Sequence, residues 1–141
     1  MMSGDTARRD ELLGGMPERF GDVVGDDHRG AFRSATAELE ASLDGLGDLD
    51  EEVDSLLFGT MPLGVLVQIL SGDNLVHCWD LARGTGQEFD PSDDVVESTT
   101  AFFGGFVTDD LRASGAFCPA VAPSDGASPM DRLAAFCGRT L

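Results

Sequence analysis

The sequence contains no lysine and no tyrosine, and it has only one tryptophan and two histidines. Its nine basic residues are therefore all arginine, and they face 26 acidic residues, which gives a formal net charge of −17 at pH 7. A field of this sign repels phosphate backbones and anionic membrane surfaces, so we expect no nucleic-acid or membrane partner. An acidic surface without lysine suits a salt-rich cytoplasm, which predicts either a halophilic host or simply an acidic protein.

Cysteines and long apolar runs are also scarce. Cys78, Cys118 and Cys137 are odd in number and form no CxxC pair, which argues against a disulfide framework or a zinc finger. We expect Cys118 and Cys137 to fill apolar space. The longest apolar stretch, residues 63–70, is too short to cross a bilayer, and residues 1–15 lack the apolar centre of a signal peptide. These features predict a cytoplasmic protein.

Amphipathic helical segments make up most of the remaining sequence, and 141 residues fit a single domain, residues 1–141. Periodicity predicts helices over residues 29–43 and 92–113, the second interrupted near Gly104, and capping residues predict a helix that starts at Ser128. Asp26 or Asp27 is the expected N-cap of the first of these. No segment is strongly typical of a β-strand, although residues 55–60 suit a short extended or turn segment. The predicted fold class is all-α.

The segment from Thr60 to Gln87 is the most informative part of the chain and reads as one long helix. Thr60 is a candidate N-cap, Pro62 fits the first turn, and Gly84 or Gly86 can end the helix in a left-handed conformation. At about 100° per residue, six residues fall on one stripe that we expect to be buried. They are Leu63, Leu66, Leu70, Asn74, His77 and Leu81.

A histidine thus lies in the middle of the expected buried face, with Asp73 one turn before it. Residues four apart project side by side, roughly 5–6 Å apart at Cβ, so Asp73 and His77 are candidate ligands of one divalent metal ion. The alternative is a buried histidine hydrogen-bonded to a carboxylate, without metal. Asp80 suits a solvated or outer carboxylate better than a ligand. His28 is a candidate third ligand or an exposed residue at its helix start.

Two runs of the sequence resemble a known family. Residues 73–87, DNLVHCWDLARGTGQ, combine a carboxylate-x-x-x-His step with a Trp-Asp-Leu-Ala-Arg run and a Thr-Gly-Gln turn. Residues 123–139, PSDGASPMDRLAAFCGR, form a Pro-rich turn and a short helix that ends in Phe-x-Gly-Arg. Together they resemble the metal-binding four-helix-bundle proteins of the DinB/YfiT-like superfamily, in the branch related to the metal-binding domain of mycothiol-dependent maleylpyruvate isomerase. The resemblance extends from about Gly14 to the C-terminus.

This resemblance implies part of a DinB-like four-helix bundle that holds a divalent ion, expected to be zinc, with Asp73 and His77 in two of three ligand positions. In the family, a histidine on the second of two earlier helices supplies the other ligand, and those helices have no counterpart here. The chain therefore resembles an N-terminally shortened member. Because two long helices cannot bury both of their apolar faces alone, we predict a homodimer that rebuilds the bundle.

Three interpretations of function stay open at this point. The first is a metal-dependent enzyme, a thiol-dependent transferase or isomerase or a hydrolase-like protein, with a thiol such as mycothiol as cofactor. The second is a non-catalytic helical interaction protein with a degenerate metal site. The third is an incomplete reading frame, to which the doubled Met1–Met2 start points. Arg83 is the nearest cation for an anionic substrate, although an ion pair on the helix surface is its simpler role.

Overall fold

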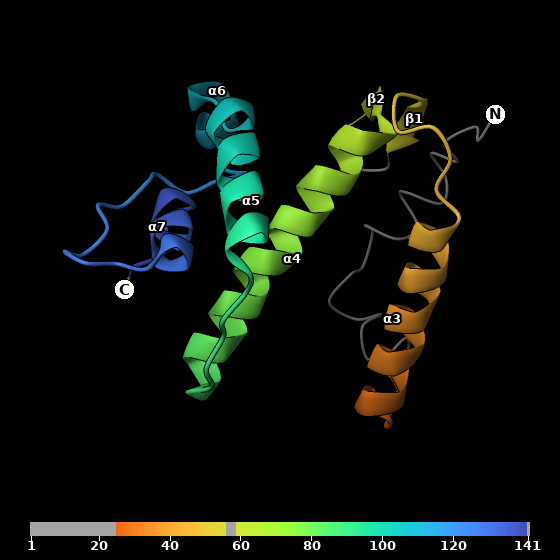
Figure 1. Ribbon diagram of the computed structural model, residues 1–141, viewed down its shortest axis with the longest axis horizontal. Helices are drawn as coiled ribbons and strands as arrows, with labels where there is room; N and C mark the ends of the chain where they lie inside the picture. Colours follow the sequence, from red (N-terminus) through yellow and green to blue (C-terminus); the bar gives the residue numbers. More distant parts are fainter. Residues whose placement is uncertain (1–24, 56–58, 141) are drawn as a thin grey trace. The chain divides into compact units, whose positions relative to one another are not determined.

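A computed structural model describes residues 25–55 and 59–140 of the protein (Figure 1). These residues form five helices and one two-stranded sheet, so the all-α prediction is confirmed in outline. The chain divides into two compact units, residues 1–66 and 67–141. Within the described ranges, none of the helices is long and apolar enough to cross a membrane.

The first unit contains helix α3, His28–Asp44, and a β-hairpin. Asp27 caps α3, as predicted, because its side chain accepts a hydrogen bond of 2.9 Å from the Gly30 N–H. No residue of α3 is buried, and its apolar side chains are exposed; Phe32 is 73% exposed. The helix therefore depends on its own hydrogen bonds and cap more than on packing within the described part of the chain.

The hairpin corrects the prediction that no segment is a strand. Strands β1, Glu52–Ser55, and β2, Gly59–Pro62, pair antiparallel, with Val53 opposite Met61. The strands are only four residues long, so the sequence offers little of the alternation that marks a strand. Of the extended or turn segment predicted at residues 55–60, Ser55 ends β1 and residues 59–60 begin β2, while residues 56–58 lie outside the described part of the chain.

Helix α4, Leu63–Thr85, starts later than predicted. The expectation that Thr60 caps this helix and Pro62 fits its first turn is wrong, because both residues lie in β2. The first N–H groups of the helix find backbone acceptors instead: Leu63 donates to the Glu51 carbonyl and Gly64 to the Leu49 carbonyl, each at 2.8 Å. The other end agrees with the prediction, since Gly86 follows the last helical residue with a φ of +69°.

The second unit adds α5, Asp93–Phe106, α6, Asp109–Ala113, and α7, Pro129–Phe136. The predicted interruption near Gly104 is misplaced, because Gly104 is helical and the break follows Phe106. Thr108 explains the position of this break: its side chain accepts from the Leu111 N–H at 3.2 Å and so caps a new helix. Ser128 caps α7 as predicted, by accepting from the Asp131 N–H at 3.0 Å.

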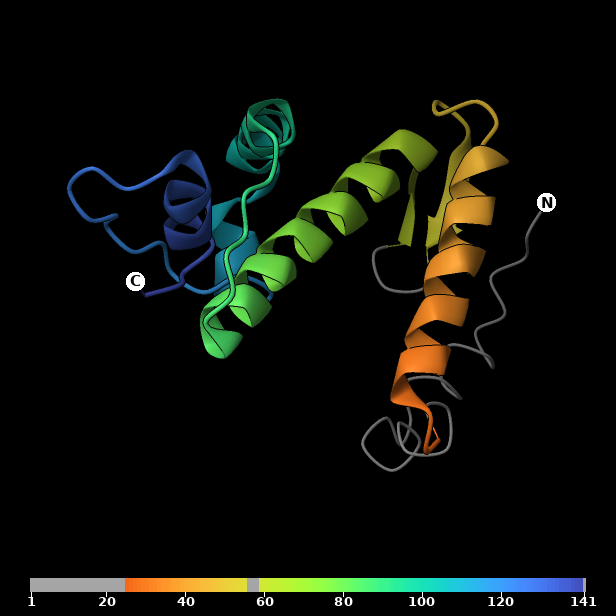
Figure 2. The same cartoon turned by 60° about the horizontal axis from the view of Figure 1, so that its bottom comes forward.

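The core of this unit lies between α4, α5 and α7. Figure 2 shows these three helices from a second direction. Phe103, Leu133 and Cys137 are its largest fully buried side chains. Cys137 therefore fills apolar space as expected, whereas Cys118 is exposed, which corrects that half of the prediction. The buried residues of α4 are Ile69, Gly72, Leu75, Val76, Trp79 and Ala82, and Leu75, Val76 and Trp79 among them belong to this core.

Candidate metal site

The predicted buried stripe of α4 is not the face that the structure buries. Leu70 and Leu81 are 43% and 64% exposed, and the side chains of Asp73 and His77 are 63% and 61% exposed. The reason is that α4 carries apolar residues on more than one face, so periodicity alone does not select which face meets the core. The tertiary contacts of Trp79 and its neighbours make that choice. The interpretation of His77 as a buried histidine is therefore wrong.

The structure does bring Asp73 and His77 together on the exposed face of α4. The Nε2 atom of His77 lies 3.4 Å from Oδ1 of Asp73, one turn earlier. The other ring nitrogen, Nδ1, lies 3.1 Å from Oδ2 of Asp80, one turn later. The imidazole thus bridges two carboxylates through its opposite edges, so Asp73 and Asp80 cannot share a metal ion bound to one nitrogen of this ring. The role of Asp80 as a solvated or outer carboxylate of a metal site stays a prediction.

Asp80 has a second partner far along the chain. Arg139 donates two hydrogen bonds to it, from Nε to Oδ1 at 3.1 Å and from Nη2 to Oδ2 at 2.8 Å. The Arg139 guanidinium holds the pKa of the Asp80 carboxyl below its usual range, with a smaller effect from His77. In turn, the hydrogen bond to Asp80 raises the pKa of Arg139. Asp80 is therefore an anion that accepts hydrogen bonds from both sides.

A third protein ligand is not evident near Asp73 and His77. Among residues 25–55 and 59–140, no group of three histidine, cysteine, aspartate or glutamate side chains is arranged to hold a metal ion. His28 is the first residue of α3 and is exposed, as one of its two interpretations predicts. Cys78 is exposed on α4 beside His77.

Among residues 25–55 and 59–140, Arg83 does not form the surface ion pair that the sequence suggests. Its guanidinium carbon lies 5.2 Å from the centre of the Trp79 ring, a cation–π contact. The Trp79 indole N–H donates to Oδ1 of Asp131 at 2.9 Å and thereby joins α4 to α7. A cavity of about 510 Å³ lies beside these residues, and Glu88 and Asp90 also line it. The acidic side chains that line this cavity repel an anionic substrate, so the cavity does not favour such a substrate at Arg83.

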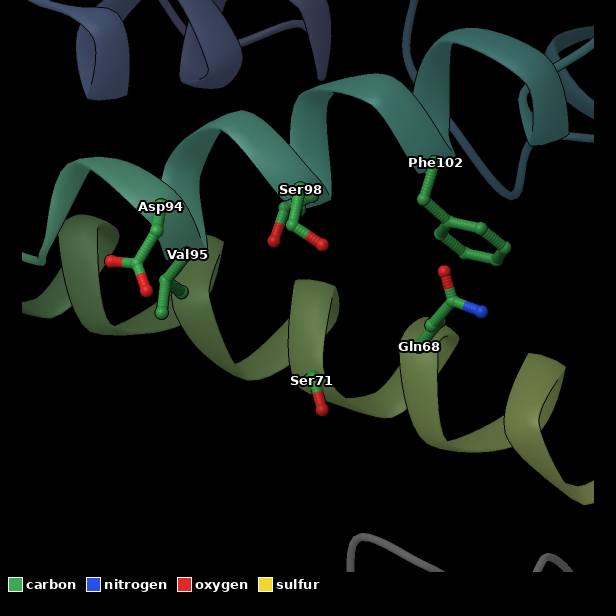
Figure 3. A pocket seen from close by; sticks show the side chains of 7 residues that line it. Gln68, Ser71, Asp94, Val95, Ser98 and Phe102 are labelled. Atoms are coloured by element: carbon green, nitrogen blue, oxygen red, sulfur yellow. The ribbon is translucent and has the colours of Figure 1, made fainter. Parts of the chain in front are cut away.

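A second cavity, of about 330 Å³, lies between α4 and α5 (Figure 3). Gln68 and Ser71 line it from α4, and Asp94, Ser98 and Phe102 line it from α5. Asp94 is its only ionisable group, and a hydrogen bond from Ser92 lowers the pKa of this carboxyl. The cavity therefore contains neither a paired acid and base nor a set of metal ligands. The chemically distinctive cluster of the described residues is the one around His77.

Comparison with known proteins gives relatives but no function. No protein-family model matches the sequence, and no solved structure matches it significantly. Two uncharacterized proteins of Mycobacterium tuberculosis, from strains CDC 1551 / Oshkosh and ATCC 25618 / H37Rv, are each 34% identical to it over 92 residues. The match covers 61% of this chain and 48% of each relative, so the chain spans about half the length of these curated relatives. The DinB-like assignment stays a prediction from the two motifs.

Proposed function

We propose that the protein binds one divalent metal ion, best matched by zinc, through Oδ1 of Asp73 and Nε2 of His77. The observation that carries this proposal is the 3.4 Å separation of these two atoms on the exposed face of α4. In a tetrahedral zinc site with Zn–N and Zn–O distances of about 2.1 Å, two ligand atoms lie about 3.4 Å apart. The pair therefore has the spacing of one edge of a zinc site.

The exposure of this pair fits an open site better than a closed structural one. A structural zinc ion takes four protein ligands, whereas a catalytic one keeps a position for water or substrate. When bound, such an ion would act as a Lewis acid toward a substrate or a thiol cofactor. The DinB-like motifs favour an enzyme of the thiol-dependent transferase, isomerase or hydrolase type. The third protein ligand would come from a second copy of the chain.

Metal content and zinc affinity of the purified protein test the proposal. We expect stoichiometric zinc, and a loss of affinity of at least about tenfold in both Asp73→Ala and His77→Ala. Asp90→Ala is the matched control, because it removes one carboxylate charge from an exposed position of the same unit. If zinc binds equally well to all four proteins, or if the control loses as much affinity as Asp73→Ala, the site is not at this pair.

A second candidate function, a helical interaction protein, is favoured by the apolar surface of α3. Phe32, Leu39 and Leu43 are 73%, 50% and 45% exposed on this helix. Their seven- and four-residue spacing places them on one face, which is typical of a helix that packs against another. We propose a second copy of the chain as the occupant of this face, in a homodimer that completes a four-helix bundle.

Light scattering tests the homodimer. We expect a dimer mass for the parent protein and a monomer mass for Leu39→Glu, since a charge at an apolar contact opposes association. Ala41→Glu is the control, because it adds the same charge on the opposite face of α3, and it should keep the dimer mass. A monomer mass for the parent protein over the micromolar range would overturn the homodimer but would leave the metal proposal to its own test.

A further inference from the structure

We infer that helix α3 packs against α3 of a second copy of the chain in the antiparallel direction, in a register that places Arg33 of each copy beside Glu40 of the other. This inference rests on the homodimer proposed above as a second candidate function, and it is independent of the proposed metal ion. It adds the orientation of the two helices and the residues that select it. Its basis is the distribution of apolar and charged side chains along α3, of which no residue is buried.

The apolar face of α3 determines how two copies of the helix can pack. Core positions of a two-helix coiled coil alternate between spacings of three and four residues, and α3 carries Phe32, Thr36, Leu39 and Leu43 in this pattern. In an antiparallel pair, Phe32 of one copy lies beside Leu43 of the other, and Thr36 lies beside Leu39, so every layer contains a leucine. Thr36 suits this position, because its hydroxyl already donates to the Phe32 carbonyl at 2.9 Å and its burial leaves no unpaired donor.

The charges of α3 are separated along its length. Its first half carries Arg29 and Arg33, whereas its second half carries Glu38, Glu40 and Asp44. This order opposes the helix macrodipole, because anions are favourable near a helix N-terminus and cations near a C-terminus, and the first turn of α3 has no acidic residue and the last turn no basic one. The arrangement is therefore unfavourable within one helix. It becomes favourable in an antiparallel pair, where the basic half of each copy lies beside the acidic half of the other.

Arg33 and Glu40 lie on the same flank of the apolar face, because seven residues are close to two helical turns. Both side chains are exposed, and the ion pairs among residues 25–55 and 59–140 involve other side chains. In the antiparallel register, Arg33 of each copy faces Glu40 of the other, which gives two symmetric pairs. Charges beside the core positions set the orientation of coiled coils in this way. The other flank carries the small residues Ala35 and Ser42, which let the two helices approach closely.

The same charges disfavour other occupants of this face. A parallel pair would place each charge of α3 beside the same charge of its copy, so like charges would meet along the whole helix. A partner helix of one charge sign would match only half of α3, since the other half carries charges of that sign. A second copy in the antiparallel direction matches both halves. The net charge of −17 per chain opposes any association of two copies, so we expect these local pairs to offset a general repulsion.

Charge reversal tests the inference, with the dissociation constant of the dimer measured by sedimentation equilibrium at low salt. We expect Arg33→Glu and Glu40→Arg each to raise this constant at least about tenfold, because each sets like charges opposite one another at two symmetric contacts. The double variant Arg33→Glu/Glu40→Arg restores opposite charges and should return the constant to within about threefold of the parent value. An equimolar mixture of the two single variants should form a heterodimer of parental affinity, because each supplies the charge that the other lacks.

The design separates pairing from net charge and from helix stability. Arg33→Glu makes the chain more negative and Glu40→Arg makes it less negative, so net charge alone would weaken the first dimer and strengthen the second. Both substitutions agree better with the macrodipole than the parent residues do, so neither should destabilise α3 itself. Ser34→Glu and Ala41→Arg are the matched controls, because they change the charge in the same two directions on the opposite face of α3. Both controls should keep the dissociation constant within about threefold of the parent value.

The outcomes distinguish this inference from the homodimer on which it rests. A dimer that Leu39→Glu dissociates but that neither charge reversal weakens would overturn the antiparallel register and leave the homodimer standing. Weakening by both single reversals without recovery in the double variant would also overturn the register. A monomeric parent protein over the micromolar range would overturn the homodimer and this inference together. In about 1 M NaCl, the difference between the parent and the single variants should shrink, since exposed charge pairs are screened by salt.

Discussion

The ring of Phe103 in α5 occupies the space where a side chain at Gly72 in α4 would lie. A Cβ atom added to Gly72 would be 2.8 Å from Cε1 of Phe103, closer than real Cβ contacts come. Both residues are buried, and Phe103 is only 2% exposed. The missing side chain thus lets a large aromatic residue sit directly against the backbone of α4, and it is a condition for the close approach of the two helices.

Gly72→Ala is therefore expected to destabilise the protein although alanine favours helices. Overpacking of a filled core costs about 1–3 kcal/mol in the free energy of unfolding. Gly84→Ala in the same helix meets nothing within 4 Å and should stabilise by about 0.5–1 kcal/mol. Urea unfolding followed by circular dichroism measures both. Equal effects of the two substitutions would contradict the packing of Phe103 on Gly72.

The hydrogen bond between Trp79 and Asp131 makes a prediction that depends on pH. Burial of Asp131 raises the pKa of its carboxyl, but hydrogen bonds from Trp79 and Ser128 outweigh this effect, and the pKa lies below its usual range. A carboxyl with a lowered folded-state pKa stabilises the protein fully above its unfolded pKa of about 3.9 and loses this contribution as the pH falls through the folded value.

Asp131→Ala should accordingly lower the free energy of unfolding by about 1 kcal/mol at pH 7, and by less near pH 3. Part of the loss at pH 7 comes from the removed cap contacts of α7, so the difference between the two pH values is the informative quantity. Asp90→Ala, whose carboxylate has an exposed position, serves as the control. A cost that is larger at pH 3 than at pH 7 would contradict the direction of the pKa shift.

The buried cysteine should react much more slowly than the two exposed ones. Burial raises the pKa of the Cys137 thiol to about 11, so little thiolate forms there at pH 8. Cys78 and Cys118 are exposed. With iodoacetamide at pH 8, peptide mass spectrometry should show fast modification of the two exposed cysteines and protection of Cys137. All three should react in concentrated urea. Modification of Cys137 at the rate of Cys78 in the folded protein would show that its site is open.

Local chemistry explains the parts of the fold that the sequence predicts well. Helix caps and the turns that end helices depend on residues within a few positions, so the sequence alone predicts them. Examples are the N-caps Asp27 and Ser128 and the left-handed residue Gly86. The buried face of α4 is different, because Leu70 and Leu81 compete with Leu75 and Trp79 for the core, and only contacts with α5 and α7 decide between them. The four-residue strands are too short for a clear pattern.

The same difference between local chemistry and tertiary contacts applies to the candidate site. The adjacency of Asp73 and His77 follows from helical spacing and was predictable. The pairing of Arg139 with Asp80 was not, because it depends on where the turn after α7 places a residue 59 positions from its partner. The Gly138–Arg139 pair was the available signal, since glycine at a helix end predicts a left-handed turn, but its direction in space is a tertiary property.

The most direct measurement of the central claim is a zinc titration of the 15N-labelled protein, followed at the ring nitrogens of both histidines. The account predicts that His77 Nε2 changes its chemical shift and saturates at one zinc ion per chain. If the His77 ring nitrogens do not respond to zinc, Asp73 and His77 do not form a metal site, and the account is contradicted at its centre.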